Sequence, residues 1–312
     1  QLFQTFTDGD GNYSCYLPTG SYRIWAVGGN QSREYYEETI YENAAQVVVS
    51  DGSQQPGVNF TLDTPSFTPQ YLFFNMDATS LASEPALRQA IAYGTDRRRI
   101  ADATYIGAEV SDSIMPSFYW AYPESGLPIY DYDPVLARQI LEGAGWVDED
   151  SDGIRERDGV RLHLDYYTSS FNNRDHIRTR LYPIFVANMT AIGIEVEVHD
   201  MDNLDFINES PRVWDLAQFA WGGVDLNVDY GPDNLQWFFY TGNGSNVGGY
   251  SNPAADALLD SADAETTRAG KLPYLQTHQI QVMTDLPVLP LVLANDHPLN
   301  YPSFSARLTE NQ

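Results

Sequence analysis

The densest group of residues that could do chemistry is an acidic turn, in the stretch GWVDEDSDGIRERDGVRLHL from Gly145 to Leu164. Its aspartates alternate with other residues and are followed by a glycine, as in the first half of an EF-hand loop, where carboxylate oxygens hold calcium. The complete loop ends in a bidentate glutamate, but Gly159 stands at the corresponding position here. The candidate ligands are Asp148, Asp150, Asp152, Glu156 and Asp158.

Two interpretations of this turn are open. Either the carboxylates hold a calcium ion, with Glu156 or Asp158 in place of the missing glutamate, or the turn is a solvated acidic connection in a β-hairpin. A second acidic stretch, DGDGN at Asp8–Asn12, is predicted to be a β-turn, because glycine permits positive φ and Asp and Asn bond to their own backbone. We expect no required cofactor, and Ca²⁺ is the one candidate ion.

Catalytic motifs are missing from the sequence. The histidines are scattered without the spacing of paired metal ligands, and neither a nucleophile elbow nor a phosphate-binding loop is present. The one cysteine, Cys15, has no partner for a disulfide and lies in an alternating pattern typical of a strand. The sequence therefore predicts a protein that is not an enzyme. The histidines are His163, His176, His199, His278 and His297.

The composition favours an acidic globular protein. Hydrophobic residues make up 43% of the 312 residues and aromatic residues 13%, which is enough for sizeable cores. The formal net charge of -26 excludes nucleic acid as a partner, because binding a phosphate backbone requires a positive surface. Lys271 is the single lysine, and the acidity indicates either adaptation to high salt or an ordinary acidic secreted protein.

Signals for cellular location are weak. No run of about 18 apolar residues occurs, and the N-terminus lacks a basic region followed by an apolar one, so neither a membrane span nor an attached signal peptide is visible. Several N-x-S/T sequons agree with an exported surface that could be glycosylated. They begin at Asn12, Asn30, Asn59, Asn188, Asn208 and Asn243.

The elements that must position these residues change in type along the chain. Residues 1–62 contain β-branched and aromatic runs separated by Gly, Asn and Asp, which predicts a small antiparallel β-sandwich. Its expected strands are TFTDGDGNYSCYL, GSYRIWAV, AQVVVS and GVNFTL. DTPSFTPQ, with two prolines and no periodicity, predicts a linker. From residue 71, helical patterns alternate with strands such as VRLHLDYY, IGIEVEVHDM and DLAQFAW, which predicts an α/β domain.

Helix signals in the second region are specific. The stretch EPALRQAIAYGTDRRRIADATY, from Glu84 to Tyr105, has apolar residues at helical spacing. In DPVLARQILEGAG, Asp133 is placed to cap a helix whose first residue is Pro134. Further helices are expected in RDHIRTRLYPIFVANMTAIG, NPAADALLDSADAE and RAGKLPYLQTHQIQVMTDLP.

The order of these segments resembles the extracellular solute-binding proteins of the oligopeptide-, dipeptide- and nickel-binding class, the receptors of ABC importers. The matching pieces are NMDATSLASEPALRQAIAYGTDRRRI, YDYDPVLARQILEGAGWVDEDSDGIRERDGVRLHL, AIGIEVEV, DLAQFAW, GGYSNPAADALLDSA and DLPVLPL, which lie between Tyr71 and Tyr301. The resemblance implies an α/β lobe of the periplasmic-binding-protein type, the second of two lobes around a cleft. Arg88, Asp96 and Arg97 match family positions, where we expect ion pairs that fix helix ends.

The first sixty residues resemble a different family, the transthyretin-like carboxypeptidase regulatory module, in TDGDGNYSCYLPTGSYRIWAVG, VVVSDG and GVNFTL. This module is a non-catalytic β-sandwich, and the two strands with which it usually begins are absent here. We therefore expect a sandwich at residues 1–64, a linker at 65–70 and the α/β lobe at 71–312. Because the sandwich stands where a first lobe belongs, either the chain is part of a longer receptor or a lone lobe has another task.

The resemblance to the solute receptors also implies where a ligand binds. In peptide-binding relatives an aromatic residue at the end of the DLAQFAW strand lines the cleft, and a following aspartate receives the ammonium group of the peptide. Trp221 matches the aromatic residue, and Asp225 or Asp229 is the candidate aspartate. The usual position of that aspartate holds a valine, so a sugar or another polar solute stays open. Asn246 and Tyr250 match a loop at the rim of the cleft.

The function implied by this resemblance is extracytoplasmic solute binding for an ABC importer. Two lobes would close around a peptide or another small polar solute, and the partners would be the permease subunits. One lobe offers half a cleft, so we expect weak binding unless a missing N-terminal lobe or another copy completes the site. The alternative is a cell-surface structural or adhesion protein that uses both domains as interaction modules.

Overall fold

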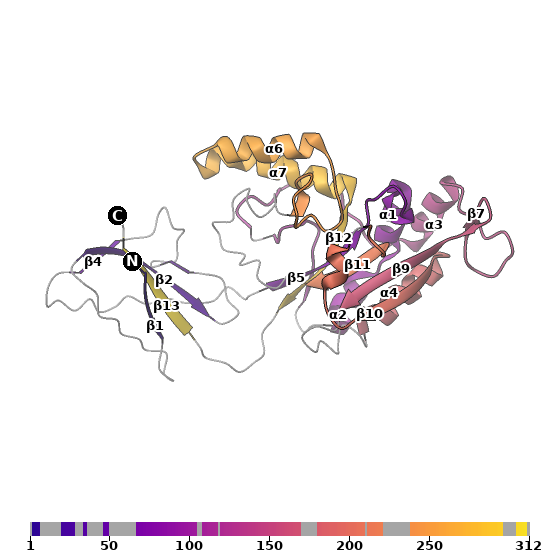
Figure 1. Ribbon diagram of the computed structural model, residues 1–312, viewed down its shortest axis with the longest axis horizontal. Coiled ribbons are helices and arrows are strands. Elements are labelled where there is room, and N and C mark those ends of the chain that lie inside the picture. Colours follow the sequence, from indigo (N-terminus) through magenta and orange to yellow (C-terminus); the bar gives the residue numbers. More distant parts are fainter. Residues whose placement is uncertain are drawn as a thin grey trace. The chain divides into compact units, whose positions relative to one another are not determined.

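The computed structural model describes residues 2–6, 20–28, 34–35, 46–49, 67–104, 108–117, 119–169, 180–209, 211–220, 238–295 and 304–310. The chain divides into two compact units. One consists of residues 1–67, 223–230 and 295–312, and the other of residues 68–222 and 231–294. The described elements of the first unit are strands, whereas the second combines strands and helices (Figure 1).

The first unit contains one antiparallel sheet, in which the last strand of the chain lies between two early strands. β13 pairs with β1 on one side and with β2 on the other, and β3 and β4 both pair with β2. Figure 1 shows the yellow C-terminal strand beside the indigo N-terminal ones. The strands are β1 (Leu2–Phe6), β2 (Gly20–Gly28), β3 (Glu34–Tyr35), β4 (Gln46–Val49) and β13 (Phe304–Glu310).

The sequence predicts part of this sheet. The strands expected in GSYRIWAV and AQVVVS are confirmed as β2 and β4. β13 differs from the prediction, which places every residue after 70 in the α/β lobe, because a local pattern does not reveal a pairing partner so distant in the sequence. The described strands form a single sheet, so the second layer of the predicted sandwich is not among them. Cys15 and the Asp8–Asn12 turn lie outside the described residues.

The second unit is built on a six-stranded mixed sheet in the order β10-β9-β11-β5-β12-β6, accompanied by a small β7–β8 hairpin. β9 is parallel to β10 and to β11, whereas β11 is antiparallel to β5 and β12 is antiparallel to β6. The strands are β5 (Phe67–Phe74), β6 (Glu109–Val110), β7 (Glu156–Arg157), β8 (Val160–Arg161), β9 (His163–Ser169), β10 (Glu195–Met201), β11 (Leu216–Ala220) and β12 (Val288–Asn295).

Alternation along β9 decides which side chains enter the core. Leu164 and Tyr166 are fully buried, whereas His163 and Asp165, on the other face of the strand, are partly exposed. Tyr166 packs against Phe185 of α4, with 5.2 Å between ring centroids. Burial of two such rings stabilises the contact of helix and sheet by roughly 2 kcal/mol for each ring. β9 therefore presents one apolar face to a helix and one polar face outward.

Four helices of the second unit, α2, α3, α6 and α7, start at a residue whose side chain caps the first turn. Asp133 accepts hydrogen bonds from the backbone N–H groups of Val135 and Leu136, which confirms the predicted start of α3. The stretch predicted as helical from Glu84 to Tyr105 contains two helices, because Asp96 accepts a hydrogen bond from the N–H of Arg99 and caps a second one. α6 and α7 lie side by side (Figure 1). The helices are α1 (Pro85–Gly94), α2 (Arg97–Thr104), α3 (Pro134–Gly143), α4 (Tyr182–Ala191), α6 (Pro253–Ala264) and α7 (Arg268–Asp285), with short 3-10 turns η2 (Leu81–Ser83) and η4 (Asp205–Asn208).

Strand β5 begins earlier than the sequence pattern predicts. Residues 67–70, which DTPSFTPQ indicates as linker, belong to this strand. Pro69 is compatible with it because it precedes the first residue that pairs with β11, Gln70 opposite Ala220. The rest of the predicted linker lies outside the described residues. None of the helices in the described ranges is long and apolar enough to span a membrane.

Two buried arginines connect the first helices to distant parts of the second unit. Arg88 donates to the carbonyl oxygen of Asp285 at 2.8 Å. Arg97 donates to the carbonyl oxygen of Pro290 at 3.2 Å and forms an ion pair with Asp112 at 3.1 Å. Burial lowers the pKa of both guanidinium groups, and the negative charges of Asp285 near Arg88 and of Asp112 beside Arg97 oppose that effect. The expected ion pair is present for Arg97, whereas the acceptors of Arg88 are backbone carbonyl oxygens.

Candidate functional site

The acidic turn lies between α3 and the β7–β8 hairpin and is closed by its own backbone. Asp148 accepts a hydrogen bond from the N–H of Gly153 at 3.1 Å, and Asp152 accepts one from the N–H of Ile154 at 2.8 Å. Gly153 has a φ of 93°, in the left-handed region that glycine adopts without strain. Short-range hydrogen bonds therefore fix the aspartates of the turn.

The structure brings three of the five predicted calcium ligands together. Oxygen atoms of Asp148, Asp150 and Glu156 all lie within 4.8 Å of one another. This limit is about twice the distance of roughly 2.4 Å between calcium and a ligand oxygen, so the three can reach one ion. Glu156 is the most sheltered of them, with 13% of its side chain exposed. The arrangement offers oxygen donors alone.

The two other predicted calcium ligands are directed elsewhere. Asp152 forms an ion pair with Arg161 at 2.6 Å. Its pKa is lowered, first by the N–H of Ile154 and then by the hydrogen bond from Arg161. Asp158 is exposed in the connection between β7 and β8, with a φ of 54°. The carboxylate of Asp152 is thus paired with an arginine of the protein, and Asp158 belongs to the turn of the β7–β8 hairpin.

A buried arginine anchors the acidic turn. Arg155 donates to the carbonyl oxygens of Ile192 at 2.9 Å and Trp146 at 2.8 Å, and it pairs with Glu142 of α3 at 3.0 Å. Gly193 leaves room for this side chain, since a Cβ there would lie 2.7 Å from Cγ of Arg155. The turn is thereby attached both to α3 and to the segment that precedes β10.

The residues predicted to contact a solute directly, Trp221, Asp225 and Asp229, lie outside the described residues, and their roles stay predictions. The strand that precedes them in the sequence is confirmed. β11 lies inside the six-stranded sheet, between β9 and β5, and ends at Ala220. The strand predicted from the DLAQFAW pattern is therefore confirmed.

Asn246 and Tyr250, predicted at the rim of the cleft, are buried and bonded within the protein. Asn246 donates to the carbonyl oxygens of Tyr240 and Tyr250, at 3.0 and 2.7 Å, and accepts from the N–H of Tyr250. The Tyr250 hydroxyl donates to Asp285 at 2.6 Å, and burial raises the pKa of that hydroxyl. They hold the loop before α6 in shape, with 7% and 3% of their surfaces exposed.

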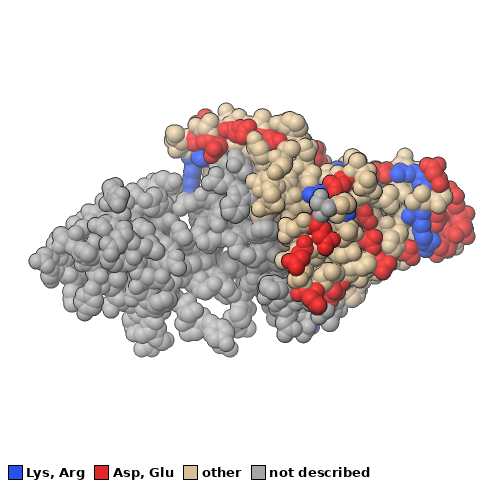
Figure 2. All heavy atoms as spheres, in the orientation of Figure 1, with Lys and Arg blue, Asp and Glu red and all other residues tan. Residues whose placement is uncertain are grey.

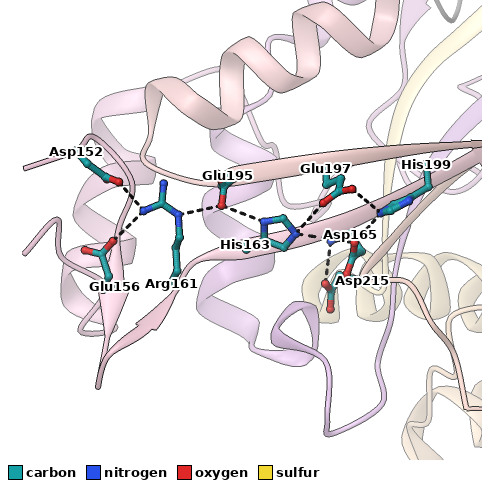
Figure 3. A network of polar contacts seen from close by, with 9 residues as sticks. All are labelled: Asp152, Glu156, Arg161, His163, Asp165, Glu195, Glu197, His199 and Asp215. Atoms are coloured by element: carbon teal, nitrogen blue, oxygen red, sulfur yellow. Dashed lines mark hydrogen bonds and ion pairs between the residues drawn. The ribbon is translucent and has the colours of Figure 1, made fainter. Parts of the chain in front are cut away.

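A second group of polar side chains, the sheet-face cluster, lies on the outward face of β9 and β10 and consists of His163, Asp165, Glu195, Glu197 and His199 (Figure 3). The strand register places Glu195 opposite His163 and Glu197 opposite Asp165. In His163, Nδ1 lies 3.0 Å from Glu195, while Nε2 lies 3.9 Å from Asp165 and 3.8 Å from Glu197. Nε2 of His199 lies 2.7 Å from Asp165. On this face, therefore, imidazole nitrogens and carboxylate oxygens from the two strands lie next to one another.

Sequence reasoning misses the sheet-face cluster. His163 and His199 lack paired-ligand spacing along the chain, yet they stand on neighbouring strands. The usable signal is alternation, since HLD in β9 and EVEVH in β10 each put their polar residues on one face. What the sequence does not provide is the parallel pairing of these two strands in this register.

Acidic side chains are prominent on the described surface in the view of Figure 2. They gather over α6 and at the end of the second unit that carries β7, where a strip of basic side chains lies beside them. The ion pairs of Arg161 with Asp152 and Glu195 belong to the β7 end. Such a surface attracts cations and repels polyanions.

Comparison with known families decides the class of the protein. Residues 30–246 match the bacterial extracellular solute-binding proteins, family 5, middle. The chain belongs to this family. The resemblance predicted from the segment order is thereby confirmed. The match begins at residue 30, inside the region predicted as a separate regulatory-like module, and that module is not shown.

Individual members of the family agree with the fold. The chain is 26% identical to the oligopeptide-binding protein AppA of Bacillus subtilis over 233 residues, which is 73% of this chain and 41% of AppA. The structure of AppA in complex with a nonapeptide gives a TM-score of 0.65 at 20% identity, covering 79% of this chain and 47% of AppA. A mannohexaose-bound periplasmic oligopeptide-binding protein from Thermotoga maritima also gives 0.65, at 21% identity, covering 80% and 47%. The family-5 chain thus has the α/β fold of these proteins and spans less than half of their length.

Proposed function

We propose that this chain supplies one lobe of an extracytoplasmic solute receptor for an ABC importer, with a peptide or another small polar solute as its ligand. The observation that carries the proposal is the family-5 match over residues 30–246. The mixed six-stranded sheet and its similarity to AppA support it. AppA was solved with a nonapeptide and the Thermotoga maritima protein with mannohexaose, so both peptides and sugars are reasonable candidates.

The ligand site of this proposal follows β11. Open α/β sheets bind ligands beyond the carboxyl ends of their strands. β11 is an inner strand of the sheet, and its carboxyl end is Ala220. Trp221 comes next in the sequence and would supply an aromatic wall. Asp225 or Asp229 would receive the ammonium group of a peptide, because a cation removed from water needs a charged partner. Asn246 would act by shaping the neighbouring loop.

A second lobe is part of the proposal. The chain covers 41% of AppA, and a small solute gains useful affinity when it is buried from both sides of a cleft. We infer that another polypeptide segment or another copy of the chain completes the cleft. The closed receptor would then deliver its solute to permease subunits.

Calorimetric titration of the chain with mixed oligopeptides and with mannohexaose tests this function. We expect weak binding by the chain alone, and we expect Trp221→Ala and Asp225→Asn to weaken it further. Asp263→Asn removes the same charge at an exposed residue of α6 that has no role in the proposed site, and should leave binding unchanged. Binding tighter than about 1 µM by the chain alone would refute the need for a second lobe. Equal binding by Trp221→Ala and the unchanged chain would refute the site.

We also propose that the acidic turn holds Ca²⁺ through Asp148, Asp150 and Glu156. The spacing of their oxygens within 4.8 Å and the oxygen-only donor set support this assignment. Arg161, which pairs with Asp152 at 2.6 Å, also lies 3.5 Å from Glu156, so a bound ion would compete with this arginine for that carboxylate.

For residues 1–64 we retain the proposal of a regulatory-like β-sandwich. β2 and β4 are antiparallel neighbours, as the segments GSYRIWAV and AQVVVS of such a module require. Hydrogen-exchange protection in GVNFTL would support a second sheet, and rapid exchange there would count against it.

A further inference from the structure

The sheet-face cluster has the arrangement of a metal site. His163, Asp165 and Glu197 each offer one ligand atom, and these atoms all lie within 4.8 Å of one another. His163 and Asp165 are two residues apart on β9, and Glu197 stands opposite Asp165 on β10, so all three share one face. We propose that these three residues bind a divalent transition-metal ion of the zinc type. This inference goes beyond solute binding and does not depend on it.

The distances suit such an ion after small movements. Nε2 of His163 lies 3.9 Å from Oδ1 of Asp165 and 3.8 Å from Oε2 of Glu197. Ligands at about 2.1 Å from a tetrahedral zinc ion are roughly 3.4 Å apart, so Nε2 of His163 has to approach each carboxylate oxygen by a few tenths of an ångström. Side chains that are 36%, 39% and 61% exposed can make that movement by rotation. The backbone of β9 and β10 can stay in place.

The other nitrogen of His163 is held in the manner of a metal ligand. Nδ1 lies 3.0 Å from Oε2 of Glu195, and Arg161 donates to the same oxygen at 2.9 Å. A histidine that binds a metal usually donates its second N–H to a carboxylate, which fixes the tautomer and directs the free nitrogen to the ion. In Figure 3 the free nitrogen, Nε2 of His163, faces Asp165 and Glu197. His199, 2.7 Å from Asp165, positions that carboxylate from the other side.

The donor types select the class of ion. Imidazole nitrogen favours zinc, nickel, copper or iron over calcium and magnesium, which take oxygen ligands. The acidic turn, with oxygen donors alone, has the opposite preference. A bound ion would also join β10, at the edge of the sheet, to β9 and would offset the repulsion between Asp165 and Glu197. The site is therefore expected to stabilise this edge of the sheet.

Titration of the full chain with Zn²⁺ tests the proposal, using protein without a polyhistidine tag that has been stripped with a chelator. We expect one strong site by calorimetry and a higher thermal midpoint with the metal bound. His163→Ala should weaken Zn²⁺ binding about 100-fold or more, and Glu195→Gln should weaken it about 10- to 100-fold. Co²⁺ in place of Zn²⁺ should give the intense visible absorption of a four-coordinate site, and His163→Ala should remove it.

Two matched variants separate this site from general attraction of cations to an acidic protein. Asp202→Asn removes one exposed negative charge just after β10, and Asp150→Asn removes a carboxylate of the acidic turn. Both should keep the Zn²⁺ affinity of the unchanged chain. Equal affinity in His163→Ala and the unchanged chain would overturn the proposal, as would a loss in Asp150→Asn as large as that in His163→Ala. Circular dichroism confirms that each variant is folded.

Discussion

The acidic turn and the sheet-face cluster are both rich in carboxylates, but they are held by different forces. In the turn, backbone N–H groups a few residues away bond to Asp148 and Asp152. In the sheet-face cluster, side chains from two strands are brought together by register, as with His163 and Glu195 at 3.0 Å. Local hydrogen bonds set the first site, and tertiary structure sets the second. The first site is therefore visible in the sequence and the second is not.

The two sites also differ in the ions that they can hold. The turn offers carboxylate oxygens, which suit calcium, whereas the cluster adds the imidazole of His163, which suits transition metals. Arg161 lies between the sites and pairs with Asp152 at 2.6 Å and with Glu195 at 2.9 Å. One cation of the protein thus compensates part of the charge of both, and substitutions can separate their contributions.

Removal of the anchor of the turn should have the largest effect on stability. Arg155→Ala would leave the buried carbonyl oxygens of Ile192 and Trp146 and the exposed carboxylate of Glu142 without this donor. We expect the free energy of unfolding of the second unit to fall by about 3 kcal/mol, measured by urea denaturation. Arg138→Ala, at a partly exposed arginine of α3, is the control and should change it by less than about 1 kcal/mol. Similar values for the two variants would show that Arg155 is not the anchor.

A third histidine, His278, contrasts with the partly exposed His163 and His199 of the sheet-face cluster. His278 of α7 is fully buried, and neither ring nitrogen has a hydrogen-bond partner among the described residues. Burial lowers its pKa to about 4, although Asp256 acts in the opposite direction. Since the unfolded chain takes up this proton near its ordinary pKa of about 6.5, stability is lost as the pH falls from about 6.5 to about 4. The loss from this residue should approach about 3 kcal/mol.

The measurement for His278 is the difference between two pH profiles. Urea denaturation from about pH 7.5 down to about pH 4.5 should show a flatter profile for His278→Leu than for the unchanged chain. His199→Ala, which removes a partly exposed imidazole, should keep the steep profile. If His278→Leu and the unchanged chain lose stability in parallel, His278 does not remain neutral in the fold.

Calcium should stabilise the chain through the acidic turn and not through the sheet-face cluster. The expected stabilisation is somewhat smaller than the pH effect of His278. After treatment with a chelator, Ca²⁺ at about 100 times its Kd should stabilise the chain by about 2.7 kcal/mol, read as a shift of thermal unfolding. Asp148→Ala should remove this gain because it deletes a ligand, whereas His163→Ala should keep it. The absence of any gain in the unchanged chain would leave the turn as a solvated connection.

The fold was predictable wherever local chemistry determines it. Asp133 caps α3 and Asn252 caps α6 because a short polar side chain can reach the free N–H groups of the first turn. Alternation likewise identifies β9 through its buried Leu164 and Tyr166. The entry of β13 into the first sheet was not predictable, since a strand's own pattern does not name its neighbours.

In the candidate sites, too, the features set by local sequence were predictable and those set by distant contacts were not. The approach of Asp148, Asp150 and Glu156 was predictable from ligand spacing, because a tight turn has few ways to place them. The diversion of Asp152 was not, since it depends on Arg161 from β8 reaching across the hairpin. Those residues that follow β11 in the sequence, Trp221 among them, are outside the described part of the chain, and their prediction rests on the family resemblance.

Arg161→Gln should have the smallest effect and shows whether the two sites are linked. The side chain is 39% exposed, so its ion pairs are screened by water and contribute little at neutral pH. Arg161 is the main cause that lowers the pKa of Glu195, ahead of His163, and it adds to the effect of the N–H of Ile154 on Asp152. A lowered carboxyl pKa gives stability that is present above the unfolded pKa of about 4 and is lost as the pH falls through the folded value.

We therefore expect Arg161→Gln to reduce the stability lost between about pH 7 and about pH 3, with Arg99→Gln, an exposed arginine of α2, as the unchanged control. Urea denaturation at both pH values measures this difference. An acid loss in Arg161→Gln as large as in the unchanged chain would mean that backbone N–H groups and His163 hold these carboxylates without the arginine. The turn and the cluster would then be independent sites, and an ion bound at one should not alter the affinity of the other.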